Sequence, residues 1–192
     1  MINFQQAIKK LEEGNVHFVN DKLENRNLHA KRRKELVDGQ EPWAIILSCA
    51  DSRVVPELIF DTGIGDLFVI RVAGNIANTS TIATIEYAVA HIHTPVIVVL
   101  GHENCGAVTA AMADADHGDN LNHLLANIQP AKMTATDQSI NGVAKQNAVL
   151  TSKELVDKSE IIRRAIQKKE LEIIPAYYHL GSGKVDFYIE NS

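Results

Sequence analysis

Three short runs of apolar residues constrain the fold of this 192-residue chain more than any other feature. They cover residues 43–47, 67–72 and 95–100, and the last reads PVIVVL. β-branched residues of this kind favour strands. The apolar residues follow one another instead of alternating with polar ones, which is typical of strands covered on both faces, as in parallel sheets. The runs therefore predict three buried strands.

Segments with helical spacing separate and follow these runs. Residues 79–92 carry apolar side chains at helical intervals, and helices are also predicted over residues 105–113, 119–129 and, with breaks, 139–169. Strands that alternate with helices predict an α/β fold with a mostly parallel central sheet flanked by helices. Because the length suits one unit, we expect a single domain over residues 1–192.

The two ends of the chain have other patterns. Residues 4–11 have helical spacing that Gly14 is expected to interrupt, and residues 22–38 predict a second, mostly polar helix. We expect these leading helices to be arms added to a core that begins near Trp43. At the other end, residues 173–180 and 185–189 flank a Gly-Ser-Gly segment, which predicts a C-terminal β-hairpin.

Composition excludes several classes of protein. The formal net charge is −5 and aromatic residues are few, which argues against a nucleic-acid-binding platform. No stretch approaches the roughly 20 apolar residues of a membrane span, and the first residues lack the pattern of a secretory signal. Two cysteines are too few for a disulfide framework. We therefore expect a cytoplasmic protein with reduced thiols and neither nucleic-acid nor membrane partners.

Reactive side chains follow two of the predicted strands. Cys49, Asp51 and Arg53 come directly after the first run, and His102 and Cys105 come after the third. Ligands in open parallel sheets bind beyond the carboxyl ends of the strands. If the two strands are neighbours, all five side chains converge at one edge of the sheet.

Cys49, His102 and Cys105 form a plausible set of zinc ligands. Thiolates with an imidazole suit zinc better than magnesium or calcium, and the spacing His102-x-x-Cys105 would place both residues on one side of a first helical turn. Three ligands leave one position open. Asp51 either fills it, which makes a structural site, or is held by Arg53 and leaves it to water. Inert core thiols and a redox disulfide are the alternatives.

The two motifs Cys49-x-Asp51-Ser52-Arg53 and His102-x-x-Cys105 resemble those of the β-class carbonic anhydrases. The resemblance extends through PELIFDTGIGDLFVIRVAGN and IEYAV and covers roughly residues 38–113. It implies zinc (Zn²⁺) bound by the two cysteines and the histidine, with Asp51 and Arg53 as a catalytic dyad. It also implies Asp51 as an alternative fourth ligand in a closed state. The implied activity is the reversible hydration of carbon dioxide to bicarbonate and a proton by zinc-bound hydroxide.

The resemblance also implies partners and a substrate cleft. Members of this family form homodimers or homotetramers, so residues 1–38 are expected to be a helical arm for dimerisation. Gln40 stands nine positions before the first cysteine, where the family has a cleft glutamine. Phe68 and Tyr87 fall at positions that wall the apolar cleft. The alternative for Gln40 is a residue in a surface loop. The alternative for Phe68 and Tyr87 is an ordinary core position.

The sequence departs from the family pattern at several positions. Ala73 stands where the family often has a larger aliphatic residue, and Glu103 stands where it commonly has a small hydroxyl residue. Ile46 stands where members regulated by bicarbonate carry a tryptophan, although Arg71 and Tyr178 are present. We therefore expect the regulatory bicarbonate site to be absent or weak. Two rival functions stay open. One is the hydrolysis of carbon disulfide or carbonyl sulfide by the same kind of zinc site, and the other is a structural or storage role for zinc.

Overall fold

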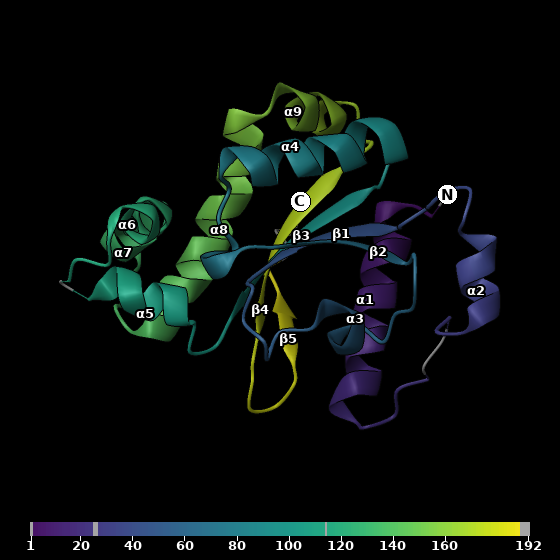
Figure 1. Cartoon of the computed structure of the whole chain (residues 1–192), viewed down its shortest axis with the longest axis horizontal. Coiled ribbons are helices and arrows are strands. Elements are labelled where there is room, and N and C mark those ends of the chain that lie inside the picture. The colour runs from purple at the N-terminus through teal and green to yellow at the C-terminus, as the bar shows by residue number, and fades with distance from the viewer. Residues whose placement is uncertain (1, 25–26, 114, 189–192) are drawn as a thin grey trace.

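The computed structural model describes residues 2–24, 27–113 and 115–188, and a five-stranded sheet forms its centre (Figure 1). The strands are β1 (Ala44–Ser48), β2 (Leu67–Arg71), β3 (Val96–His102), β4 (Glu172–Tyr178) and β5 (Val185–Phe187). They lie in the order β2-β1-β3-β4-β5, with the first four parallel and β5 antiparallel to β4. The mostly parallel sheet and the C-terminal hairpin are both as predicted.

Helices cover both faces of the sheet. Their bounds are α1 (Phe4–Val19), α2 (Ala30–Glu35), α3 (Pro56–Ile59), a 3₁₀ turn (Ala73–Asn75), α4 (Thr79–Tyr87) continued by a π turn (Ala88–Ile92), α5 (Gly106–Met112), α6 (Asp119–Ala126), α7 (Gln129–Thr134), α8 (Ile140–Lys158) and α9 (Glu160–Gln167). Helices α4 and α9 lie on one side, and α1 and α3 on the other (Figure 1). The α/β fold class is therefore confirmed.

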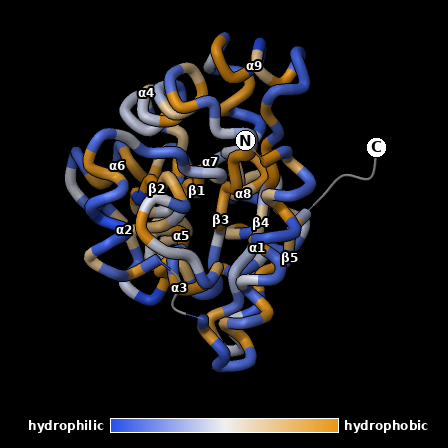
Figure 2. The backbone as a smooth tube through the Cα atoms, turned by 90° about the vertical axis from the view of Figure 1, so that its right-hand side faces the viewer, coloured by the Kyte–Doolittle hydropathy of each residue, from blue (hydrophilic) through white to orange (hydrophobic). Residues whose placement is uncertain are grey.

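The central strands are buried because their alternate side chains enter two separate cores. On β1, Ile46 packs with the residues of α1 and α3, whereas Ile45 and Leu47 pack with those of α4, α8 and α9. Both β1 and β3 are buried along their whole length. Full burial of such a side chain contributes about 1.5–3 kcal/mol, so these strands fix the sheet. Figure 2 shows the hydrophobic strands enclosed by helices of mixed hydropathy.

Helix α1 corrects two expectations. Gly14 does not interrupt it, because the helix runs without a break from Phe4 to Val19. Gly14 is instead a point of close packing, since a Cβ atom there would lie 1.9 Å from the carbonyl oxygen of Phe60. The helix is also not an addition outside the core, because Leu11 and its apolar neighbours are buried against the sheet of the same chain.

The second leading helix is shorter than predicted. Residues 22–38 were expected to be helical, but α2 spans only Ala30–Glu35 and has no buried residue. Residues 25 and 26 lie outside the described part of the chain. A short, highly charged segment without an apolar face gains little from packing, which explains why the helix does not extend. The role of residues 1–38 in dimerisation stays a prediction.

No helix in the described ranges is both long enough and apolar enough to cross a membrane.

Candidate metal centre

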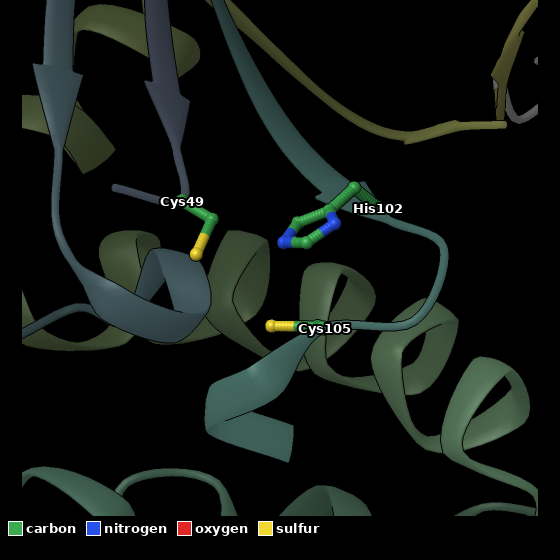
Figure 3. Close-up of side chains that lie close together, drawn as sticks. All are labelled: Cys49, His102 and Cys105. Atoms are coloured by element: carbon green, nitrogen blue, oxygen red, sulfur yellow. The ribbon is translucent and has the colours of Figure 1, made fainter. Parts of the chain in front are cut away.

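The metal centre forms where the neighbouring strands β1 and β3 end. Cys49 follows the last residue of β1, and His102 is the last residue of β3. Cys105 comes from the next turn of the chain, where it is the N-cap residue of α5. The predicted convergence is therefore present, but its geometry is different: His102 belongs to a strand and shares no helical turn with Cys105. Figure 3 shows the three side chains pointing toward one another.

The donor atoms of Cys49, His102 and Cys105 all lie within 4.8 Å of one another, and all three residues are buried. His102 Nδ1 lies 2.9 Å from the backbone oxygen of Glu103. Because a carbonyl oxygen can only accept, Nδ1 carries the proton and Nε2 keeps a free lone pair. Nε2 is buried without a hydrogen-bond partner among the described residues. A buried imidazole lone pair that faces two sulfurs fits a zinc ion.

The two sulfurs differ in their affinity for protons. The side-chain contact with Cys105, together with the hydrogen bond from the backbone N–H of Gly74, lowers the pKa of Cys49 well below its usual range. The same contact with Cys49, together with burial, raises the pKa of Cys105. Cys49 is therefore the thiol that ionises first, and Cys105 is the one that keeps its proton longer. A divalent cation would displace that proton and bind both thiolates. Both cysteines are free, so the alternative of a disulfide is not what the structure contains.

Asp51 is paired with Arg53 and not with the donor cluster. Arg53 Nε donates to Asp51 Oδ1 at 2.9 Å, and Nη2 donates to Oδ2 at 2.7 Å. The backbone N–H of Arg53 also donates to Oδ1, at 2.9 Å. These bonds hold the pKa of Asp51 well below its usual range, with the side-chain bond from Arg53 as the largest cause. Oδ2 still lies only 3.9 Å from His102 Nε2, so the carboxylate borders the open side of the cluster.

The three predicted cleft residues do not join the metal cluster within one chain. Phe68 lies beside Ile45 in the sheet, four residues before Cys49, which corresponds to about 13 Å along the strand. Tyr87 contacts Phe68, with ring centroids 6.4 Å apart, and is 51% exposed. Gln40 is exposed in the segment that leads into β1. All three therefore lie toward the opposite end of the strands from the donors.

The sequence patterns did not point to Gly74 or Asn147, and they pointed to Arg71 only for the regulatory site, but all three help to hold Cys49 in place. The N–H of Gly74 donates to Cys49 Sγ at 3.3 Å, and the Asn147 amide donates to the Gly74 carbonyl oxygen at 2.8 Å. Arg71 Nε donates to the Cys49 carbonyl oxygen at 3.1 Å. The sequence offered one sign of this contact: Asn147 is a polar residue that follows Val143 by four positions, so it lies on the buried face of α8.

Comparisons with known proteins agree with this geometry. A profile of the family described as carbonic anhydrase matches residues 44–185. Carbonic anhydrase 2 of Mycobacterium tuberculosis is 35% identical over 185 residues, which cover 93% of this chain and 89% of that protein. The carbonic anhydrase of Mycolicibacterium smegmatis is 33% identical over 187 residues, covering 94% and 91%.

A solved structure extends the comparison to the fold. A tetrameric β-carbonic anhydrase from Sordaria macrospora superposes with a TM-score of 0.77 at 26% identity, and the match covers 98% of both chains. The family profile spans most of the residues that build the sheet and all three metal-donor residues. On these grounds the chain belongs to the β-carbonic anhydrase family and is a carbonic anhydrase.

Proposed function

We propose that this enzyme hydrates carbon dioxide reversibly to bicarbonate and a proton, with a zinc ion held by Cys49, His102 and Cys105. One observation carries the proposal: a carboxylate that Arg53 holds by both oxygens borders a buried cluster of three donors. A purely structural site has no need of such an arrangement, because Asp51 would serve there as the fourth ligand. When bound, zinc lowers the pKa of a coordinated water and so supplies a hydroxide nucleophile near neutral pH.

Asp51 orients the attacking oxygen in this proposal. Its carboxylate stays ionised because Arg53 lowers its pKa, so it can accept a hydrogen bond but cannot donate one. An attacking oxygen that keeps its proton and donates a hydrogen bond to Oδ2 turns a lone pair toward the carbon of carbon dioxide. Arg53 acts through Asp51: it keeps the carboxylate away from the fourth position and fixes its orientation.

We further propose that the enzyme works as a homodimer or homotetramer in the cytoplasm, with Gln40, Phe68 and Tyr87 in the substrate cleft. Strand β2 is an edge strand, and its apolar residues are only partly buried within one chain. A second copy that covers this edge would bury the apolar residues of β2. The proposed cleft would then lie between the two copies, beside the metal centre of one of them. The tetrameric state of the Sordaria macrospora enzyme supports such an assembly.

The regulatory bicarbonate site is proposed to be absent. Ile46 is fully buried in β1 and offers no hydrogen-bond donor. Arg71 donates instead to the carbonyl oxygens of Cys49 and Asp51. Arg71 lies on β2 and Tyr178 on β4, with two strands between them. We expect added bicarbonate to inhibit hydration only as an ordinary product, without cooperativity, in initial rates at several bicarbonate concentrations. A sigmoidal dependence would contradict this.

The decisive test combines rate and metal content on one sample. We expect Asp51→Asn to retain zinc and to lose about 100-fold or more in hydration rate by stopped-flow measurement, because a neutral amide is a weaker hydrogen-bond acceptor than the ionised carboxylate. Glu57→Gln, the same kind of change at an exposed carboxylate, is the control. Full zinc content without hydration at any pH would favour a structural or storage role. Turnover of carbon disulfide or carbonyl sulfide, without turnover of carbon dioxide, would favour the rival hydrolytic function.

A further inference from the structure

Helix α8 places an amide in the core directly behind the metal centre. Asn147 is only 2% exposed and donates from Nδ2 to the carbonyl oxygen of Gly74 at 2.8 Å. Asparagine is a poor residue for a helix interior, and a buried amide costs free energy unless it is hydrogen-bonded. The contact joins residues that are 73 positions apart, so it holds the helix against the turn Ala73–Asn75.

That turn contacts the proposed metal ligand. Gly74 has a φ of 71° and Asn75 has a φ of 44°, so two consecutive residues are in the left-handed region. Asn75 pays a conformational cost there that surrounding contacts must offset. The N–H of Gly74 donates to Cys49 Sγ at 3.3 Å, while its carbonyl oxygen accepts from Asn147. Asn147 therefore holds the residue that donates to the sulfur.

A second asparagine of α8 holds the other half of the centre. Asn141 Oδ1 accepts from the backbone N–H of Asn104 at 2.9 Å. Asn104 is also left-handed, with a φ of 50°, and its carbonyl oxygen accepts from Arg53 Nη2 at 3.2 Å. The same Nη2 donates to Asp51 Oδ2. Asn141 therefore holds Asn104 in the position from which its carbonyl oxygen accepts a hydrogen bond from Arg53.

Helix α8 is well placed for both contacts because it packs tightly on β3. A Cβ atom at Gly101 would lie 3.0 Å from the carbonyl oxygen of Ala144 and 3.3 Å from the side chain of Ala148. Ala144 and Ala148 lie between and beside the two asparagines on the helix. The helix axis is thereby fixed against the strand that ends in His102.

We propose that Asn147 and Asn141 are positioning residues with separable tasks, an inference that rests on the proposed zinc enzyme. Asn147 sets the N–H···S hydrogen bond on Cys49 and so the strength with which the site holds its metal. Asn141 sets the position of Arg53 and so the pairing of Asp51, with no effect on metal affinity. Contacts of this kind beyond the ligands commonly change metal affinity or activity 10- to 100-fold.

The first arm of the test measures metal binding without any turnover. Chelator competition on zinc- and cobalt-loaded protein gives the affinity, and the thiolate-to-cobalt charge-transfer band reports on the sulfur. For Asn147→Ala we expect an affinity lower by about 10- to 100-fold and a band shifted to longer wavelength, because the sulfur loses a hydrogen bond. Asn147→Ser keeps a donor and should recover part of both changes. Parent-like affinity and spectrum in Asn147→Ala would overturn its role.

The second arm uses Asn141 as the matched comparison. Asn141→Ala should bind metal with parent affinity and an unshifted band, yet hydrate carbon dioxide about 10-fold or more slowly. Asn141→Asp keeps an acceptor for the Asn104 N–H and should restore the rate. Equal losses of metal affinity in both alanine variants would overturn the division of tasks. If Asn147→Ala does not fold, Asn147→Ser decides: its affinity must fall between those of the parent and of Cys105→Ser.

The two levels of inference fail in different ways. A parent protein that binds neither zinc nor cobalt would refute the proposed function itself. A parent that binds metal and hydrates carbon dioxide, with an Asn147→Ala variant that matches it in affinity and spectrum, would refute only the role of the asparagine.

Discussion

The metal centre at the ends of β1 and β3 and the free edge at β2 differ in how much of the site one chain completes. At the centre, three donor side chains meet within 4.8 Å, and Asp51 and Arg53 are already paired. At the edge, Tyr87 meets Phe68 but remains 51% exposed and apart from the donors. The three donors of the centre are therefore assembled within one chain, whereas the cleft around Phe68 and Tyr87 is proposed to be completed by a second copy.

Burial of the strands explains this difference. Every residue of β1 and β3 is buried, so any residue directly after them has a fixed position. The residues of β2 are half-buried or exposed, so one chain alone does not determine their surroundings. A side chain at the end of a buried strand can be placed from sequence, but a side chain on an open edge depends on what covers it.

The largest expected effect comes from removing one donor of the complete region. We expect Cys105→Ser to lose more than about 100-fold in zinc affinity and to lose hydration activity, because a ligand matters more than the contacts behind it. Metal analysis after dialysis, with stopped-flow rates on the same sample, checks this. Full zinc together with the full rate would show that the ligand set is wrong.

Much of the complete region was predictable because its parts are local. Cys49, Asp51 and Arg53 lie within five residues of one another, and only the pairing of β1 with β3 was needed to bring His102 to them. The two corrections to α1 and the role of Asn147 were not predictable in this way. Gly14 packs against the carbonyl oxygen of Phe60, and Asn147 bonds to Gly74, so both depend on contacts between distant parts of the chain.

The second expected effect compares two residues that lie side by side in the sheet. Leu47 on β1 is fully buried, and its register partner Ile70 on β2 is only partly buried. We expect Leu47→Ala to lower the free energy of unfolding by about 2–5 kcal/mol, the usual cost of emptying a core position. Ile70→Ala in dilute, monomeric protein should cost about 1 kcal/mol, because less apolar area is lost.

Denaturant titrations at several protein concentrations measure both values. If a second copy covers β2, the cost of Ile70→Ala rises with concentration, because this variant also weakens the association that stabilises the folded chain. The cost of Leu47→Ala stays the same, because association stabilises that variant and the parent equally. Equal costs at every concentration would show that β2 is no less buried in solution than β1, and the contrast between the two regions would disappear.

The third expected effect leaves the fold and the metal centre intact and tests the open edge itself. A charge at Tyr87 would be harmless in an isolated chain, where the side chain is 51% exposed, but costly beneath a partner. We expect Tyr87→Glu to remain folded and to weaken self-association by about 2 kcal/mol, roughly 30-fold, as at a central interface residue. Hydration should fall with it, while zinc content stays complete.

Sedimentation across a concentration series distinguishes this loss of assembly from a loss of fold. Met133→Glu is the matched control, because it places the same charge on another exposed apolar residue, at 81% exposure on α7. If both variants associate like the parent, β2 is not the interface and the cleft must be completed within one chain. If Tyr87→Glu alone dissociates and keeps its zinc, the donors are assembled by the monomer and the cleft by its partner.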